Sequence, residues 1–200
     1  MRVNGRGANA KAHLDSTALT TSGAVRLRVP FGEMRGIEAR DGGLHFTWYE
    51  DRVTLELDAG VAEKWAHAIL HPKSRLEKLG VKAGLRVCAL GCDADFVAEL
   101  AAALGDPPAT HLRGDFDLVF YGVAEIAGLA RIPALVAHLK PAGALWLTYA
   151  KGRGAPVPES AVRAALLGAG LVDTKVAAFS PAHTAVKAVI PVASRISKSR

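Results

Sequence analysis

Long apolar runs and cysteine are both scarce in this sequence. No apolar stretch approaches the roughly 18 residues that a membrane-spanning helix needs, and no apolar segment of a secretory signal follows Arg2, Arg6 and Lys11. The two cysteines, Cys88 and Cys92, are too few for a disulfide framework and have no histidine or cysteine pair at structural-zinc spacing. These absences predict reduced thiols, a cytoplasmic location, no bound metal and no membrane partner.

Acidic residues are lacking at the two ends of the chain, where basic residues gather. Six end residues account for the net charge of +6: Arg2, Arg6, Lys11, Arg195, Lys198 and Arg200. Because the rest of the chain is formally neutral, a broad basic face for phosphate contacts is not expected. We expect residues 1–23 and 194–200 to be flexible basic tails, with nucleic acid bound at most weakly through them.

The segment from residue 24 to residue 72 has the pattern of a small β-rich domain. Apolar and polar residues alternate through 24–57, and Asp41-Gly42-Gly43 is typical of a hairpin turn. Asp58 is suited to cap a following helix, which Pro72 ends. The pattern predicts an antiparallel sheet with one face covered by this helix, and it resembles a truncated pleckstrin-homology-like module.

Beyond residue 72 strands alternate with helices, which is typical of an α/β domain with a mostly parallel sheet. The periodicity predicts strands at 85–90, 117–121 and 144–149, helices at 95–104, 132–139 and 159–167, a weak strand at 110–113 and a closing hairpin at 174–179 and 185–192. We therefore expect a second domain over residues 73–193.

Three segments of this second domain carry a family resemblance. The approach to the first strand at 78–87, the strand Phe116-Asp117-Leu118-Val119-Phe120 and the turn Leu139-Lys140-Pro141-Ala142-Gly143 resemble the class I methyltransferases that use S-adenosylmethionine. The resemblance covers about residues 75–192 and implies a shortened Rossmann-like sheet.

The chain from residue 24 is also similar to an uncharacterised bacterial family of actinobacterial type. That family is made of short, degenerate methyltransferase-like proteins with an N-terminal pleckstrin-homology-like module. The similarity depends on the helix around Trp65, the segment 74–80, Lys151 and the segment 171–176. It implies a fold and almost no function.

Three features of active methyltransferases are missing. Gly91 is the one glycine left in the loop after the first strand, and Asp93 and Asp95 stand where a nucleotide-binding loop needs bare backbone. Cys88 or Ala89 replaces the acidic residue of that strand. The twelve residues between Leu104 and Asp117 are too few for two strands and a joining helix. We therefore predict no cofactor.

The candidate site is an atypical or vestigial cofactor crevice at the carboxyl ends of the strands. Its residues are predicted to be Gly91, Asp93, Asp95, Tyr121 and Lys151. Two phenols with one ammonium suit an acidic or aromatic ligand, whereas two carboxylates suit a cation or an amine. The structural alternatives are that Asp93 caps the next helix, that Asp95 complements its dipole and that Lys151 is a surface residue.

Other residue pairs give weaker indications. Cys92 near a helix start has no assigned base, and His67 with His71 has no third metal ligand. Trp48 and Tyr49 are expected in the core of the small domain, and an exposed edge there is the alternative, as a surface for a partner peptide.

The sequence thus leaves three hypotheses open. The first is a non-catalytic binding or regulatory protein, a pseudoenzyme with an unknown protein or small-molecule partner, since fold alone does not imply chemistry. The second is an S-adenosylmethionine-dependent methyltransferase with an atypical cofactor loop. The third is nucleic-acid association through the basic tails, which would depend steeply on salt.

Overall fold

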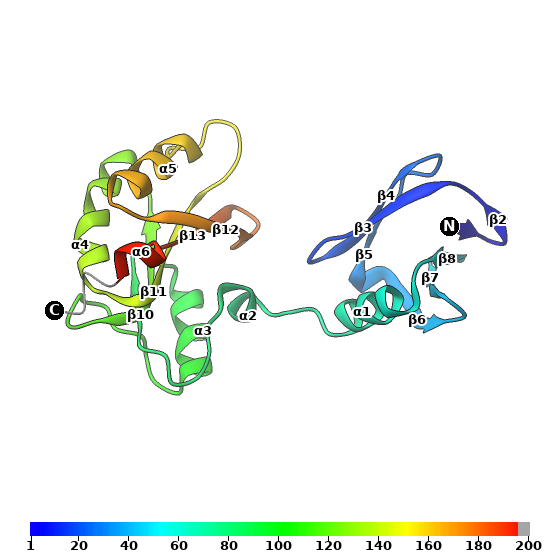
Figure 1. Ribbon diagram of the computed structural model, residues 1–200, viewed down its shortest axis with the longest axis horizontal. Helices are drawn as coiled ribbons and strands as arrows, with labels where there is room; N and C mark the ends of the chain where they lie inside the picture. Colours follow the sequence, from blue (N-terminus) through cyan, green and yellow to red (C-terminus); the bar gives the residue numbers. More distant parts are fainter. Residues whose placement is uncertain (196–200) are drawn as a thin grey trace. The chain divides into compact units, whose positions relative to one another are not determined.

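The computed structural model describes residues 1–195, and the chain divides into two compact units, Met1–Ser74 and Arg75–Arg200 (Figure 1). The sequence placed this division near residue 72. Each unit has its own hydrophobic core and is described by itself.

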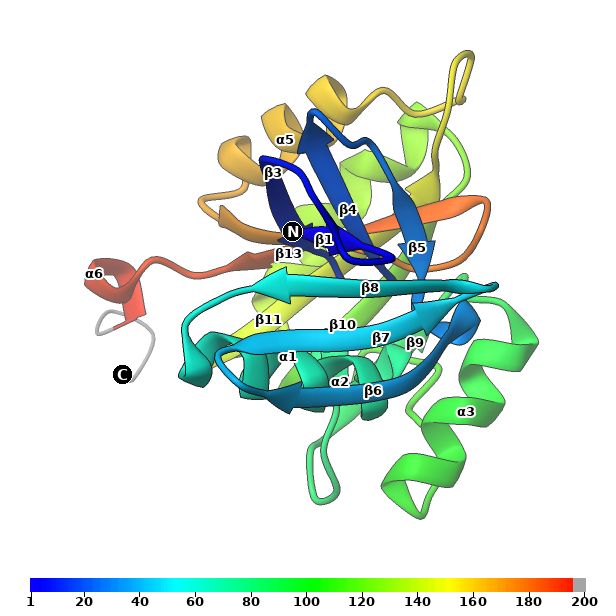
Figure 2. The same ribbon diagram turned by 90° about the vertical axis from the view of Figure 1, so that its right-hand side faces the viewer.

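The N-terminal unit contains two antiparallel sheets and one helix. Its strands are β1 (Arg2–Val3), β2 (Arg6–Gly7), β3 (Ala10–Leu14), β4 (Ala18–Gly23), β5 (Arg28–Pro30), β6 (Met34–Arg40), β7 (Gly43–Trp48) and β8 (Asp51–Glu56), with a 3-10 turn η1 (Phe31–Glu33) before β6. One sheet has the order β2-β1-β8-β7-β6 and the other β3-β4-β5. The helix α1 (Ala59–Leu70) packs against β6 and β7 (Figure 2), because Ala62, Ala66 and Ile69 form an apolar stripe that enters the core. The resemblance of this unit to a pleckstrin-homology module stays a prediction.

Residues 1–23 differ from the expected flexible tail, because they form four strands. Val3 pairs with Val53 of β8, and Leu19 of β4 is fully buried in the core of the unit. Arg2 of β1 forms an ion pair with Glu56 of the neighbouring strand β8, with Nε 2.9 Å from Oε1. One partner of β1, the strand β8, lies about fifty residues away along the chain, so local sequence patterns gave no sign of this pairing.

The C-terminal unit contains a mixed five-stranded sheet with helices on both faces. Its elements are α2 (Arg75–Leu79), β9 (Val87–Leu90), α3 (Ala94–Leu104), β10 (Phe116–Val123), η2 (Ile126–Arg131), α4 (Ile132–Ala137), β11 (Leu139–Ala150), α5 (Glu159–Gly168), β12 (Val172–Ala178), β13 (His183–Val189) and α6 (Val192–Arg195). The strand order is β12-β13-β11-β10-β9, in which β9, β10 and β11 are parallel and the last two strands antiparallel. The expected shortened α/β sheet after a small antiparallel domain is confirmed.

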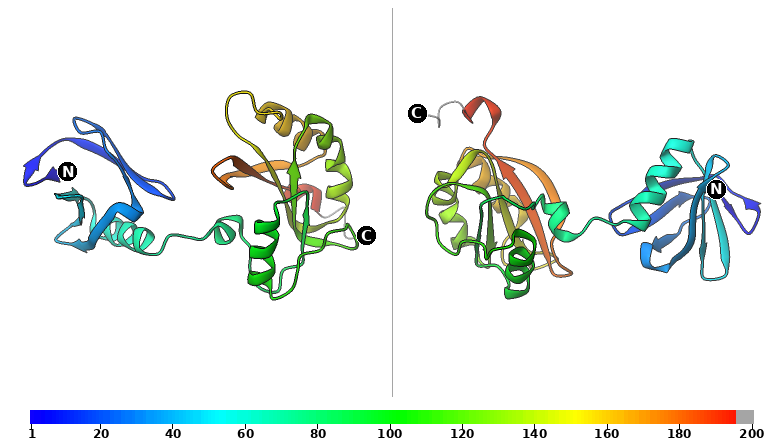
Figure 3. Two further views of the ribbon diagram at one scale, coloured as in Figure 1. Left: turned by 180° about the vertical axis from the view of Figure 1, so that it is seen from behind. Right: turned by 90° about the horizontal axis from the view of Figure 1, so that it is seen from below.

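The two faces of this sheet are covered by different helices (Figure 3). On one face Phe96 and Leu100 of α3 pack with Trp146 of β11, whose indole Nε1 donates a hydrogen bond of 3.0 Å to the Leu79 carbonyl. On the other face α4 and α5 bury Leu135 and Val162. Alternate residues of each strand serve the two cores, because successive side chains of a strand point to opposite faces.

On the outer edge of β9 a single residue pairs with the strand, where a neighbouring strand was expected. The predicted weak strand at 110–113 does not form. Ala109 alone bridges to β9, accepting a hydrogen bond of 2.9 Å from Ala89 N–H and donating one of 2.9 Å to the Val87 carbonyl. The chain therefore runs from α3 to the outside of β9 before it returns to β10. This reversal of strand order between β9 and β10 is the position at which open α/β sheets bind ligands.

The C-terminal basic residues fall partly outside the described chain. Arg195 ends α6 and donates from Nε to the Ile190 carbonyl at 2.9 Å, so residues 194 and 195 are part of a helix and differ from the expected tail. Lys198 and Arg200 lie outside the described residues. No helix within residues 1–195 is long and apolar enough to span a bilayer.

Candidate functional site

The crevice between β9 and β10 is walled by bare backbone. Gly91 follows β9 with a φ of +61°, and a Cβ there would lie 3.0 Å from the Gly122 carbonyl oxygen. A Cβ on Gly122 would lie 1.9 Å from the Gly91 carbonyl oxygen. The two main chains are thus in direct contact, and neither position accepts a side chain without displacement of the loop.

A small polar pocket opens beside this contact, on the face of the sheet that α3 covers. Its volume is about 170 Å³, and Cys92, Asp93, Thr148 and His183 supply its polar side chains. Thr148 is 5% exposed, and its hydroxyl has no hydrogen-bond partner among the described residues. His183 is held in place because its Nδ1 lies 3.1 Å from the Ser180 hydroxyl. The pocket is therefore lined by one hydroxyl that makes no hydrogen bond within the described residues.

Asp93 occupies the N-cap position of α3, but its side chain makes no capping hydrogen bond. It is exposed and lines the pocket. The carboxylate at this position is therefore available to a cationic ligand. Asp93 thus occupies the predicted N-cap position but does not make the predicted capping hydrogen bond.

Cys92 is not an activated nucleophile. Burial raises the pKa of its thiol to about 11, and the nearby Asp93 carboxylate adds to the rise, while hydrogen bonding to the Gly122 and Leu90 backbone opposes it. A thiol with this pKa stays protonated at neutral pH, so it is a weak nucleophile despite its position near a helix start.

The structure distributes the predicted site residues over different places. Gly91 and Asp93 line the crevice pocket, whereas Asp95 lies in the first turn of α3, exposed and outside the pocket lining. Tyr121 belongs to the core on the opposite face, and its hydroxyl donates to the Gly128 carbonyl at 3.1 Å. Lys151 lines a separate pocket beside Tyr149. Only two of the five predicted residues are brought together.

Sequence reasoning missed most of the pocket lining, including Gly122, Thr148 and His183. Gly122 and Thr148 lie near the carboxyl ends of β10 and β11, and the alternation in β11 places Thr148 on the same face as Trp146. That alternation is a signal that could have found Thr148. His183 comes from the closing hairpin, whose register was not readable from the sequence.

The remaining candidates of the N-terminal unit are the two histidines at the end of α1 and the aromatic pair at the end of β7. His67 and His71 stack with ring centroids 4.8 Å apart, and no group of three metal-ligating side chains occurs among the described residues. Trp48 donates from Nε1 to Glu33 at 2.9 Å, and Tyr49 is exposed beside it.

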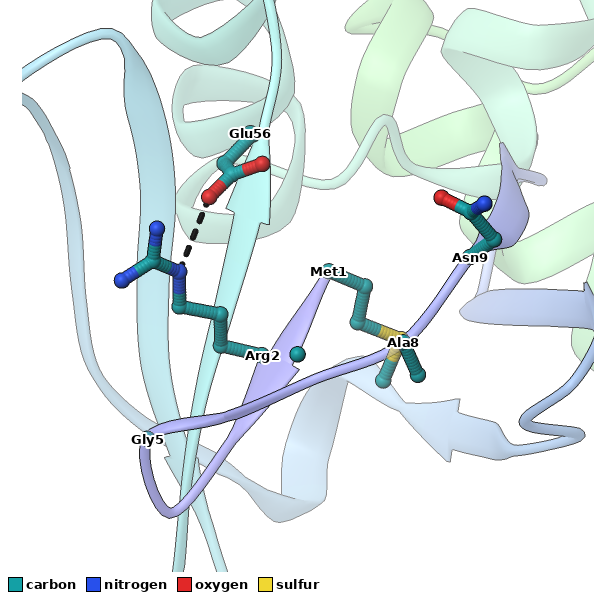
Figure 4. Close-up of a pocket in the computed structure, with 7 residues that line it drawn as sticks. Met1, Arg2, Gly5, Ala8, Asn9 and Glu56 are labelled. Carbon is teal, nitrogen blue, oxygen red and sulfur yellow. Dashed lines mark hydrogen bonds and ion pairs between the residues drawn. The ribbon is translucent and has the colours of Figure 1, made fainter.

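An open hollow of about 520 Å³ beside the β1–β2 hairpin is lined by Arg2, Glu56 and mostly small residues (Figure 4). Arg2 and Glu56 pair with each other there. Their charges therefore offer little to a ligand, and we assign no site to this hollow.

Comparisons with known proteins bear on the C-terminal unit. No protein-family model and no curated protein matches the chain. Among solved structures, magnesium protoporphyrin IX methyltransferase from Synechocystis with bound S-adenosylhomocysteine has 18% identity and a TM-score of 0.46 over 58% of this chain and 78% of that chain. A methyltransferase from Aquifex aeolicus has 16% identity and a TM-score of 0.44 over 58% of this chain and 87% of its own. The likeness is one of fold alone, a mixed sheet with helices on both faces.

The prediction of no cofactor is corrected by these comparisons. The Synechocystis enzyme was solved with S-adenosylhomocysteine and also with S-adenosylmethionine, which stands against the expectation of no cofactor. The missing loop glycines, on which the prediction depended, were weak evidence, because Gly91 and Gly122 together still present bare backbone at the crevice.

The described residues fit one end of this cofactor. The Asp93 carboxylate suits its ammonium group, and the Thr148 hydroxyl suits an oxygen of its amino-acid end. At about 170 Å³ the pocket is smaller than the roughly 300 Å³ at the lower end of small-molecule sites. For the adenosine end, no strand of the described chain lies outside β9 with a carboxylate that could bind the ribose hydroxyls. Among the described residues Ala109 alone pairs with β9 on that side.

Proposed function

We propose that the C-terminal unit is a methyltransferase-type domain that binds S-adenosylmethionine or S-adenosylhomocysteine, with the amino-acid end of the ligand in the crevice at Gly91. One observation carries this proposal: the Asp93 carboxylate and the Thr148 hydroxyl, which make no hydrogen bond within the described residues, line one pocket whose wall includes glycine backbone. A charge-assisted contact between Asp93 and the ligand ammonium supplies the main polar attraction.

The affinity should reflect the missing adenosine contacts. A pair of ribose hydroxyls bonded to a carboxylate contributes about 1.5–3 kcal/mol, which corresponds to a loss of about 10–100-fold when that carboxylate is lacking. We therefore expect weaker binding of the ligand than in a domain with the complete set of strands. Because the amino-acid end supplies the remaining polar contacts, methionine alone should also bind, though more weakly.

The test is calorimetric titration of the full chain with S-adenosylmethionine, S-adenosylhomocysteine and methionine. Asp93→Asn should weaken binding about tenfold. Asp95→Asn is the matched control, because it removes the same charge from the same helix turn outside the pocket, and it should change affinity by less than about twofold. Absence of heat at millimolar ligand, with the protein shown to be folded, would sink the proposal, and so would equal effects of the two variants.

A second candidate function is binding of the same ligand without methyl transfer, as a regulatory or sensing protein. The small volume of the crevice and the contact between Gly91 and Gly122 favour it, because they leave little space for an acceptor beside the ligand. The two functions separate in an assay with methyl-labelled S-adenosylmethionine and a cell extract. Label transfer that Asp93→Asn abolishes and Asp95→Asn retains supports an enzyme, and ligand binding without transfer supports the regulatory role.

A further inference from the structure

The hydroxyl of Tyr149 is the one buried side-chain polar atom among the described residues without a hydrogen-bond partner. Tyr149 is the next-to-last residue of β11 and is 3% exposed. Buried polar groups in folded proteins nearly always have a partner, since leaving one unpaired costs stability. The orphaned hydroxyl therefore requires an explanation.

Tyr121 provides the comparison, because it belongs to the same core on the same face of the sheet. Its hydroxyl donates to the Gly128 carbonyl at 3.1 Å, and the Arg131 guanidinium lies 5.8 Å from the ring centroid. A tyrosine hydroxyl on this face of the sheet can thus be buried and still have a hydrogen-bond partner. The difference at Tyr149 is local to the end of β11.

Tyr149 lines a cavity of about 340 Å³, twice the volume of the crevice pocket and within the range of small-molecule sites, which begins near 300 Å³. The loop 150–158 and the start of α5 supply most of its wall. In this loop Gly152 and Gly154 have positive φ angles and nothing within 4 Å of an added Cβ, so the loop has room to adjust around a ligand.

The polar groups of the cavity favour a single negative charge. Lys151 lines it, and α5, a helix of ten residues, begins there at Pro158, which has no side-chain cap to offer. Glu159 also lines it, but its carboxylate accepts hydrogen bonds from Arg163 at 2.7 Å and 3.0 Å. Burial, with the Glu159 charge, raises the pKa of the Tyr149 phenol, so this hydroxyl remains a donor.

The apolar part of the wall limits the size and shape of the ligand. Ala155, Val157 and Pro158 line the cavity beside the phenol ring. A compact apolar body with one acidic group matches this combination.

We propose that this cavity, the Tyr149 pocket, binds a small monocarboxylic acid, with one carboxylate oxygen accepting a hydrogen bond from the Tyr149 hydroxyl and the charge balanced by Lys151. The site is separate from the crevice at Gly91, and the inference does not depend on the binding of S-adenosylmethionine.

The test pairs two tyrosine variants of the full chain. Tyr149→Phe removes a hydroxyl without a partner, so the melting temperature of the free protein should stay unchanged or rise. Tyr121→Phe removes a hydroxyl that donates to Gly128, so the melting temperature should fall. If Tyr149→Phe destabilises the free protein as much as Tyr121→Phe does, the hydroxyl already has a partner such as bound water, and the proposal fails.

The ligand probes are benzoate and butyrate, with benzamide and butyramide as uncharged counterparts, measured by saturation-transfer NMR and by thermal shift. We expect the acids to bind at millimolar concentration or better, and Tyr149→Phe and Lys151→Gln each to weaken them about tenfold. Tyr121→Phe should leave the binding unchanged. Equal binding of acids and amides, no binding of either acid, or an unchanged affinity in Tyr149→Phe would each overturn the proposal.

Titration of Tyr149→Phe with S-adenosylmethionine separates this inference from the proposed function. The variant should bind that ligand as the natural chain does, so failure at one site leaves the other proposal standing.

Discussion

The two edges of the C-terminal sheet differ in how completely they are built. At one edge β12 pairs with β13 from Val172 to Ala178, and at the other Ala109 alone pairs with β9. Antiparallel neighbours need only a short turn, whereas a parallel neighbour needs a crossover of about a dozen residues or more. This chain thus keeps the strand pairing that is local in sequence and reduces to one residue the pairing that requires a long connection.

The reduced edge is also the one beside the crevice. Gly91 leads from β9 into α3, and the polar pocket opens at this point. At the complete edge β12 is mostly exposed and pairs with β13, whose Val186 and Ala188 are fully buried in the core. Substitutions at the two edges should therefore affect stability and ligand binding to different extents.

The largest expected effect is that of Gly122→Ala. Its Cβ would lie 1.9 Å from the Gly91 carbonyl oxygen, so the loop after β9 has to move. We expect a loss of about 3 kcal/mol in the free energy of unfolding, measured by urea denaturation. Gly168→Ala in α5, near the complete edge, is the control, because nothing lies within 4 Å of its added Cβ. Equal stabilities of the two variants would contradict the close contact at the crevice.

A middle effect is expected for Ala109→Pro. Proline removes the N–H that donates to the Val87 carbonyl, and this should cost about 1–2 kcal/mol. The exchange of the Ala89 amide hydrogen should accelerate, since that amide bonds to Ala109. Ala109→Ser keeps the donor and is the control. Unchanged protection of the Ala89 amide in the proline variant would show that the single bridge does not hold this edge.

The smallest expected effect is chemical and concerns Cys92. With a folded pKa of about 11, roughly one thiol in a thousand is ionised at pH 8, so alkylation by iodoacetamide should be slow and should rise about tenfold per pH unit. Because Asp93 contributes to this rise in pKa, Asp93→Asn should accelerate the reaction. Peptide mass spectrometry follows it, and fast alkylation at pH 8 would refute the raised pKa.

The raised pKa of the Cys92 thiol also makes the stability of the protein depend on pH. The folded pKa of the Cys92 thiol exceeds the ordinary value of 9.0. Its contribution to stability is therefore complete below pH 9 and is lost as the pH rises through 9 towards 11. Cys92→Ser should flatten the pH dependence of the melting temperature in this range.

Strong periodicity made much of the fold predictable. The predicted helices at 95–104 and 159–167 correspond to α3 and α5, and the predicted strand at 117–121 lies within β10. The turn expected at 141–143 is instead part of β11, where Gly143 lies so close to Phe116 that a Cβ would be 2.8 Å from its carbonyl oxygen. Such backbone contacts between strands leave no periodic signal in the sequence.

The candidate site was less predictable than the fold. The rule that strand ends meet at one edge grouped Gly91, Tyr121 and Lys151, but it does not say which face of the sheet each side chain takes. Tyr121 and Tyr149 belong to the core opposite the crevice pocket, whereas Thr148, one residue earlier, lines that pocket. One position along a strand thus separates two ligand sites.

The single bridge at Ala109 makes the segment 105–115 a natural place for insertions. The cost of closing a loop grows slowly with its length, by about 0.6 kcal/mol for each doubling. Extra residues placed after Ala109 would lengthen a connection without breaking an existing ladder, and the outer side of β9 offers a ready template for them. The sheet of this protein can therefore gain strands on that side, by engineering or by descent, while its core stays as it is.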